Sequence, residues 1–97
     1  MSKHTPGPWI VGSTGENIWG NDNRSKIATI PRDSPYIVIL EEREANAYLI
    51  SAAPELLEAC KEAETYLNAL PLGKLTPQMN YILGHLQQVI LKAEGVK

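Results

Sequence analysis

A periodic pattern of apolar and small residues runs through residues 41–70, where they recur at steps of three and four between acids and other polar groups. Such steps line one stripe of an α-helix, so this stretch is predicted to be helical with one face turned to a partner. Pro54 lies inside it, and a proline costs about 3 kcal/mol in a helix interior but little in the first turn. We therefore predict a kinked helix, whose first segment ends at Ser51 or Ala53 and whose second begins at Pro54. The stripe comprises Leu49, Ala53, Leu56, Cys60, Ala63, Leu67 and Leu70.

A second apolar stripe of the same period lies between residues 77 and 94. Thr76 supplies a capping hydroxyl and Pro77 a first-turn proline, and residues 71–75 (PLGKL) separate this helix from the one before. Two helices of similar length across a short loop predict an antiparallel helical hairpin. The apolar surface of this helix, which includes residues such as Leu83 and Ile90, is larger than one neighbouring helix can cover. We therefore predict a homodimer or higher homo-oligomer, formed when two hairpins pair as a four-helix bundle.

The first forty residues show short runs rich in aromatic and β-branched residues, separated by turn-forming residues. Residues 9–11, 17–19 and 26–30 are predicted strands of an antiparallel meander. The run YIVIL at residues 36–40 is either a fourth strand or an early helix start, and its β-branched content favours the strand. The predicted fold class is thus α+β, as a single domain over residues 1–97. An antiparallel β-meander of three to four short strands in residues 1–40 precedes a helical part in residues 41–97.

Composition narrows the class of protein. The hydrophobic fraction of 43% is typical of a globular chain, and a net charge of −2 with scattered basic residues predicts no direct nucleic-acid binding. No apolar run approaches the roughly 18 residues of a membrane span, and the N-terminus shows no export signal. We therefore expect a cytoplasmic protein without membrane contact. Cys60, the single cysteine, falls in the helical stripe and is interpreted as a small core residue.

The sharpest charge bias is acidic, because residues 41–64 hold seven acids and only two bases. A charge run on a helix is most often a solvated face. The alternative is a surface that meets a basic partner protein, and Glu55, Glu58 and Glu62 are the candidate partner-binding residues.

The titratable residues give no pattern that indicates catalysis. His4 lies in a proline-rich terminus and His85 in the middle of the last helix, so neither has a nucleophile and an orienting group at a recognisable spacing. One cysteine and two distant histidines do not make a transition-metal site. Residues 21–23 (NDN) resemble the start of a calcium loop but lack its closing glutamate, which favours a turn. We therefore expect a non-enzyme without a cofactor or metal.

The two tryptophans, Trp9 and Trp19, both fall in the predicted meander, close to Arg24. Large aromatic residues usually fill small cores, so both indoles are expected between the sheet and the helices. The alternative is an exposed indole that, with Arg24, lines a pocket for a planar or phosphate-bearing ligand. Asn46 lies one turn before Leu49, where an apolar residue would be expected, and holds either backbone or a ligand. The candidate ligand-binding residues are therefore Trp9, Trp19, Arg24 and Asn46.

Two segments carry a resemblance to a known family. The opening TPGPW at residues 5–9 and the segment ANAYLISAAPELLEA at residues 45–59 resemble a family of small bacteriophage and prophage proteins. Those proteins join a similar opening and a short β region to a helix close to ANARLIAAAPELLEAL. Here Tyr48, Ser51 and Cys60 depart from that pattern. The resemblance implies a phage protein that acts in the cytoplasm of an infected bacterium, and it brings no catalytic residue with it.

Small non-enzymatic phage proteins often act by stoichiometric binding against host defence, and the resemblance therefore implies three hypotheses. The first, favoured because oligomers create shared clefts, is a homo-oligomer that sequesters a nucleotide immune signal. The second is a blocker of the anti-CRISPR type, whose acidic helix surface occupies a basic channel of a host defence protein. The third is a structural or host-takeover accessory protein without a ligand.

Overall fold

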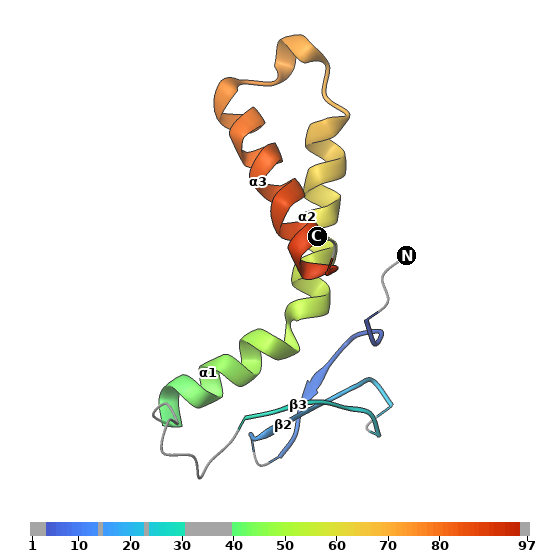
Figure 1. Cartoon of the computed structure of the whole chain (residues 1–97), viewed down its shortest axis with the longest axis vertical. Coiled ribbons are helices and arrows are strands. Elements are labelled where there is room, and N and C mark those ends of the chain that lie inside the picture. The colour runs from blue at the N-terminus through green and yellow to red at the C-terminus, as the bar shows by residue number, and fades with distance from the viewer. Residues whose placement is uncertain (1–3, 14, 23, 31–39, 96–97) are drawn as a thin grey trace. The chain divides into compact units, whose positions relative to one another are not determined.

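The computed structural model describes residues 4–13, 15–22, 24–30 and 40–95. These residues form two compact units, one within Thr5–Glu55 and the other within Leu56–Lys97. We call them the sheet unit and the hairpin unit and describe each by itself (Figure 1). The α+β fold class is confirmed, because three antiparallel strands precede the helices. The first helix belongs to the same unit as the strands, so the two units do not divide at residue 40.

The sheet unit holds three short strands, β1 (Ile10–Val11), β2 (Asn17–Trp19) and β3 (Lys26–Thr29), in the order β1-β2-β3. Both pairings are antiparallel, as expected for strands joined by tight turns. Gly15 lies between β1 and β2 with a φ of 76°, a backbone conformation that glycine adopts without steric cost. The predicted meander of three strands is confirmed, each strand within one residue of its predicted bounds.

The core of the sheet unit lies between β2 and helix α1 (Leu40–Ser51). Ile18 is 0% exposed and Ala47 is 1% exposed, and the small side chain of Ala47 allows close packing of the helix on the sheet. Ile18 pairs across the sheet with Val11 and Ala28, so these three side chains lie on the same face of the sheet, the face that packs on the helix. Of the predicted fourth strand, residues 36–39 lie outside the described residues, whereas Leu40 is already helical.

The helical stretch is interrupted next to Pro54, as the sequence predicted. α1 ends at Ser51, Ala52 forms a turn, and α2 (Ala53–Asn68) begins one residue before Pro54. Pro54 thus occupies a first-turn position, where its missing N–H removes no helical hydrogen bond. The predicted stripe is only partly inward, however. Leu49 is 63% exposed, because the sheet packs on the face of α1 that contains Ala47, and Leu56, on α2, is 49% exposed.

Gly7 and Pro54 bring the two ends of the sheet unit into contact. A Cβ added at Gly7 would lie 2.8 Å from Cβ of Pro54, closer than two carbon atoms can pack. The TPGPW opening therefore rests against the start of α2 through a residue that has no side chain. This contact gives a physical reason for the two motifs to occur together in one chain.

The hairpin unit consists of the remainder of α2, a 3-10 turn at Leu72–Lys74 and α3 (Pro77–Ala93), which confirms the predicted hairpin. Thr76 caps α3 as predicted, since its hydroxyl accepts a hydrogen bond of 3.1 Å from the backbone N–H of Met79. Lys61 of α2 and Glu94 after α3 form a salt bridge of 2.6 Å. Both side chains are partly exposed, so this ion pair contributes no more than about 1 kcal/mol.

The hairpin unit buries little hydrophobic surface. Leu83, at 8% exposure, is the only hydrophobic residue in its described part that counts as buried. Several large hydrophobic side chains are exposed instead: Leu56, Tyr66, Tyr81, Ile82, Val89 and Leu91.

Candidate binding surfaces

A cleft in the sheet unit lies beside β1 and contains one of the predicted ligand-binding residues, Trp9. Its volume is about 480 Å³, within the range of small-molecule and peptide sites. The indole of Trp9 is half-buried, and its Nε1–H donates a hydrogen bond of 3.0 Å to the carbonyl of Thr5. We name this space the β1 cleft. One wall is formed by Ile10, Val11, Gly12, Ser13 and Gly15 of β1 and the turn after it, and the other by Glu44, Ala47, Tyr48 and Ser51 of α1.

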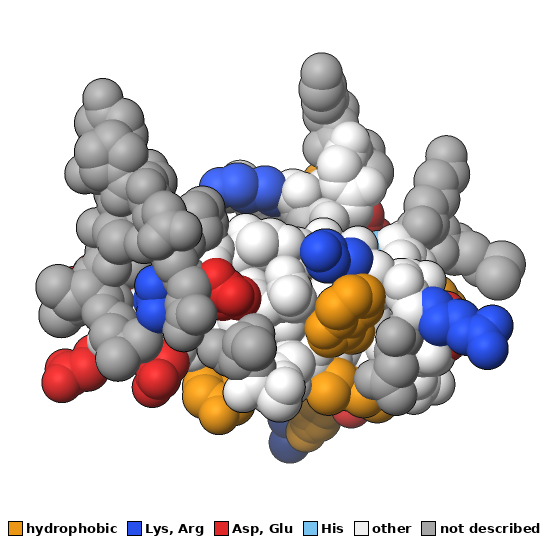
Figure 2. Space-filling model, turned by 90° about the horizontal axis from the view of Figure 1, so that it is seen from below, with side chains coloured by type: hydrophobic (Ala, Val, Ile, Leu, Met, Phe, Trp, Pro, Cys, Tyr) orange, Lys and Arg blue, Asp and Glu red, His pale blue; other side chains and the backbone are white. Residues whose placement is uncertain are grey.

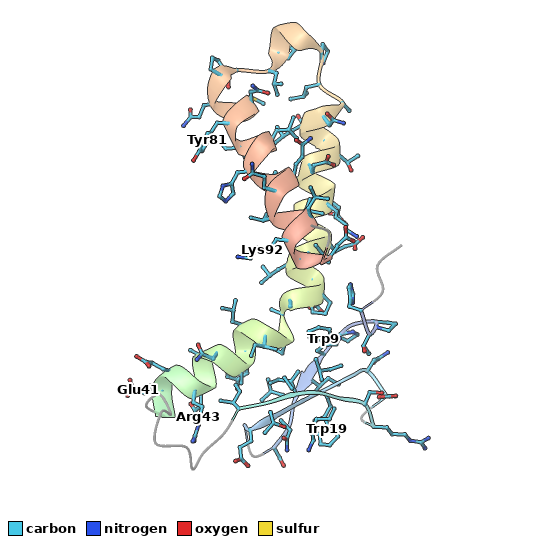
Figure 3. All side chains as sticks on the ribbon, in the orientation of Figure 1. Trp9, Trp19, Glu41, Arg43, Tyr81 and Lys92 are labelled. Atoms are coloured by element: carbon cyan, nitrogen blue, oxygen red, sulfur yellow. The ribbon has the colours of Figure 1, made fainter. Side chains whose placement is uncertain are left out.

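Trp19 lies on the opposite face of the sheet from Trp9 (Figure 3). It follows the buried Ile18 in β2, so the alternation of side chains turns it away from α1. There it pairs across the sheet with Ile10 and Lys26, and the ammonium of Lys26 lies 5.4 Å from its ring centroid. Figure 2 shows hydrophobic side chains next to Lys and Arg side chains on this outer face. The two indoles therefore cannot line the same pocket, and only Trp9 lies on the helix side.

Arg24 is exposed in the turn between β2 and β3. Its backbone N–H donates a hydrogen bond of 3.0 Å to Oδ1 of Asp22, and the N–H and hydroxyl of Ser25 donate to the same carboxylate at 3.0 Å. The hydrogen bonds from the backbone N–H of Arg24 and from the N–H and hydroxyl of Ser25 hold the pKa of the Asp22 carboxyl below its ordinary value of 3.8. The aspartate at residue 22 therefore stabilises a turn, as the sequence predicted for residues 21–23.

Asn46 is exposed on α1 and does not line the β1 cleft. Its neighbour Ala47 takes the buried position instead, so the amide needs no buried hydrogen-bond partner. Of the four predicted ligand-binding residues, the structure brings only Trp9 to the cleft. A ligand-binding role for Trp19, Arg24 or Asn46 stays a prediction.

The predicted partner-binding acids Glu55, Glu58 and Glu62 follow one another at steps of three and four along α2, and all three are exposed. Leu57 and Lys61 are less exposed and lie on the inward side of α2. Glu58 directly follows Leu57, and Glu62 directly follows Lys61. They are therefore rotated about 100° from the side of α2 that meets α3. On α3, the exposed Leu91 directly follows Ile90 and lies on the same side of the hairpin. We call Glu58 and Glu62 the acidic face of the hairpin unit.

A second face of the hairpin unit is apolar. Its members each come directly before an inward residue, which rotates them about 100° in the opposite sense from the acids. In an antiparallel pair, the second helix runs in the opposite direction and also turns its inward side the opposite way. These two reversals cancel, so residues that directly precede an inward residue lie on the same face of the hairpin in both helices. We call this the apolar face. It consists of Leu56 and Ala63 on α2, and Ile82 and Val89 on α3.

The sequence did not predict the polar wall of the β1 cleft. Glu44, Tyr48 and Ser51 follow one another at steps of four and three and share one side of α1 with Ala47. That spacing was visible in the sequence, but it is obscured by the stronger apolar pattern that begins at Leu49. The Ser51 hydroxyl donates a hydrogen bond of 2.7 Å to the carbonyl of Tyr48, which leaves its oxygen as an acceptor.

The described residues contain no group of three or more His, Cys, Asp or Glu side chains placed to hold a metal ion. His85 is exposed on α3, with its ring centroid 6.5 Å from that of Tyr81. Cys60 is half-buried in the hairpin unit. Within residues 4–13, 15–22, 24–30 and 40–95, no helix combines the length and apolar character that crossing a membrane requires.

A family model described as Salmonella phage P22 protein Y8K6 matches residues 1–97, the whole of the chain. This match confirms the resemblance to small phage proteins at the level of the family. No curated protein and no solved structure matches the chain.

Proposed function

Because the chain belongs to the family of Salmonella phage P22 protein Y8K6, we propose that it is a phage accessory protein that binds a host protein stoichiometrically in the cytoplasm of the infected bacterium. The partner is a basic protein of host defence, which the bound phage protein blocks. This is the blocker hypothesis of the sequence analysis, now given a specific surface.

The observation that carries this proposal is the division of the hairpin unit into an apolar and an acidic face. Ile82 and Val89 are 45% and 37% exposed, although hydrophobic residues that repeat at helical spacing normally cover a core. An exposed apolar patch with a polar surround is typical of a protein interface. Neither Glu58 nor Glu62 forms a salt bridge with a described residue, so both carboxylates are open to a cationic partner.

We further propose that a second copy of the chain covers the apolar face. Each hairpin presents the same strip, and a twofold axis brings identical strips together as a four-helix bundle. The acidic faces then lie on the outside of the dimer, where two copies of the acidic face increase the charge presented to one partner. Steering of a basic protein by such a field raises its association rate and depends on salt.

The test is a pull-down from the bacterial host, followed by titration of the captured protein against the purified phage protein. The double variant Glu58→Lys and Glu62→Lys is expected to weaken the complex at least about tenfold, which corresponds to roughly 1.4 kcal/mol. The matched control, Glu41→Lys with Glu42→Lys, makes the same change of charge at exposed positions on α1 and is expected to bind as the wild type does. Equal losses in both variants, or no complex above an untagged background, would exclude the acidic face as the binding surface.

Sequestration of a nucleotide immune signal is the second candidate, favoured by the volume of the β1 cleft and by Trp9 in its wall. The charge of the cleft opposes it. Among the described residues, Glu44 is the only charged one that lines it, and a carboxylate repels the phosphates of a nucleotide. Calorimetry with cyclic dinucleotides and ADP-ribose derivatives tests this hypothesis, which requires heat of binding at micromolar concentration and a loss of affinity in Trp9→Ala. Without measurable heat, the nucleotide hypothesis fails.

A further inference from the structure

β1 is an edge strand, and the β1 cleft runs along its open side. The sheet order is β1-β2-β3, so β1 pairs with β2 alone among the described strands. The free side of an edge strand carries unpaired backbone donors and acceptors, which act as a template for another strand. In the sheet unit this side faces the cleft, with Val11 among its lining residues.

The hydrogen-bond pattern identifies which backbone groups point into the cleft. Gly12 N–H donates to the carbonyl of Asn17 at 2.8 Å, which makes this a hydrogen-bonded pair of the antiparallel ladder. Such pairs alternate with non-bonded ones, so Ile10 is again bonded to β2, whereas Val11, opposite Ile18, is not. The N–H and C=O of Val11 therefore point away from β2 and toward the open edge. No residue that the structure describes forms a backbone hydrogen bond with either group.

The opposite wall of the cleft is one side of α1. Ala47 forms its floor at 1% exposure, and Tyr48, at 66% exposure, offers an aromatic ring to a ligand. Ser51 lies one turn beyond Ala47 and leaves its hydroxyl oxygen as an acceptor. A strand placed between β1 and this side of α1 would hydrogen-bond to the sheet edge and pack alternate side chains on the helix.

The charge of the cleft selects among extended segments. Glu44 is exposed and, in the part of the chain that the structure describes, is the only charged residue that lines the cleft. A lysine or arginine side chain from the added strand would form a charge-assisted hydrogen bond with this carboxylate. An acidic segment would instead place two like charges together.

We propose that the β1 cleft binds an extended segment of a partner protein by strand addition to β1, with a lysine or arginine of that segment at Glu44. The backbone of the segment bonds to Val11, and its aliphatic side chains pack on Ala47 and Tyr48. This inference goes beyond the proposed function, which places its contacts on the hairpin unit. The two proposals use different residues and fail separately, since the variants at residues 58 and 62 do not touch the β1 cleft.

The experiment uses the full chain as bait for a displayed library of random linear peptides. Selected peptides are synthesised and titrated by calorimetry, and their contacts are mapped from backbone amide shifts. The expected result is a set of peptides enriched in lysine or arginine, with the largest shifts at Val11 and along α1. A selection without basic enrichment, or without any peptide above background, overturns the proposal.

Substitution of Val11 by proline tests the backbone contact. The N–H of Val11 points away from β2, so Val11→Pro removes the donor offered to the peptide and leaves the β1–β2 ladder intact. Binding is expected to fall at least about tenfold, the equivalent of one buried hydrogen bond lost. Val11→Thr is the matched control, because it keeps the N–H and the branched side chain and is expected to retain most of the affinity. Unchanged binding in Val11→Pro overturns strand addition.

N-methylated peptides provide a second test that does not depend on whether Val11→Pro folds. N-methylation of the peptide amide that donates to the Val11 carbonyl leaves the protein untouched and is expected to abolish binding. N-methylation of the next amide, which points away from β1, is the control and is expected to be tolerated. Equal effects of the two methylations overturn the proposed pairing.

Charge reversal at Glu44 tests the specificity of the cleft. With Glu44→Lys as bait, the selection is expected to shift from basic to acidic peptides, whereas Asn46→Lys, which adds a charge outside the cleft, is expected to keep the basic preference. A second copy of β1 is the competing occupant. If Val11→Pro converted a dimer into a monomer in light scattering, the added strand would belong to another copy of this chain and the proposal would be wrong.

Discussion

The two units of this chain differ in how completely they bury their own hydrophobic side chains. In the sheet unit, Ile18 is 0% exposed beneath α1, although the unit has only three short strands and one helix. In the hairpin unit, two longer helices bury only Leu83, at 8% exposure, while Tyr81 and Ile82 stay 73% and 45% exposed. A sheet covered by a helix encloses a central residue on several sides. A pair of helices encloses only the strip between them.

This difference suits the two units to the different roles proposed for them. A unit that encloses its core is stable within one chain and can offer a preformed surface, here the β1 cleft. A unit that leaves hydrophobic residues exposed gains most from association, because each Å² of apolar surface removed from water contributes about 25 cal/mol. The sheet unit is thus suited to specific recognition, and the hairpin unit to self-association.

The largest effect is expected from Ile18→Ala in the sheet unit. A fully buried isoleucine replaced by alanine costs about 2–5 kcal/mol of the free energy of unfolding. Both tryptophans lie in the sheet unit, so unfolding followed by their fluorescence reports this loss. Ile10→Ala is the control, since Ile10 is 40% exposed, and a much smaller loss is expected there. A loss below about 1 kcal/mol for Ile18→Ala would show that the sheet unit has no enclosed core.

The next effect concerns the hairpin unit and its self-association. The double variant Ile82→Glu and Val89→Glu puts two charges on the apolar face and is expected to convert the dimer to a monomer in light scattering. A buried unpaired carboxylate costs several kcal/mol, and each 1.4 kcal/mol weakens the dimer tenfold. Tyr81→Glu is the control, because Tyr81 points away from α2 (Figure 3). A wild-type chain that is already monomeric at micromolar concentration would contradict the proposed dimer.

A smaller loss is expected from Gly7→Ala, which tests the contact between the TPGPW opening and α2. The new methyl would overlap Cβ of Pro54, and overpacking of this kind costs about 1–3 kcal/mol. Gly73→Ala is the matched control, because a Cβ there meets no atom within 4 Å. Chemical denaturation followed by circular dichroism, to which the helices of both units contribute, measures both variants. If they lose the same free energy, the packing of Gly7 on Pro54 contributes nothing to the sheet unit.

The sequence predicted the elements of this fold better than the faces they present. Turn residues and β-branched runs located β2 within its observed bounds, and Thr76 with Pro77 located the start of α3. Both signals are local, since a cap or a turn acts on its own backbone. The side of each element that faces inward depends on its tertiary partner. Apolar periodicity placed Leu49 inward, but the sheet packs on the side of α1 that contains Ala47.

The candidate sites show the same limit. In β2, Ile18 and Trp19 are both large and apolar, so alternation alone did not reveal which one faces the helix. The structure places Ile18 inside and Trp19 on the outer face, which separates the two tryptophans that the sequence had grouped. The β1 cleft was not predictable at all, because its lining comes from two elements far apart in the sequence, β1 with its flanking residues and a polar side of α1.

The smallest effect is expected at Asp22, where the sheet unit should respond to acid. The N–H groups of Arg24 and Ser25 lower the pKa of this carboxyl in the folded state, so its stabilising contribution is present above the ordinary value of 3.8 and is lost as the pH falls through the lower folded-state pKa. Asp22→Ala is therefore expected to lower the melting temperature slightly at neutral pH, and the difference from wild type should shrink in strong acid. Asp22→Asn keeps an acceptor for the two N–H groups without a titrating charge, so its difference from Asp22→Ala should not vary with pH. A difference between wild type and Asp22→Ala that is the same at every pH would show that the charged carboxylate does not stabilise the turn.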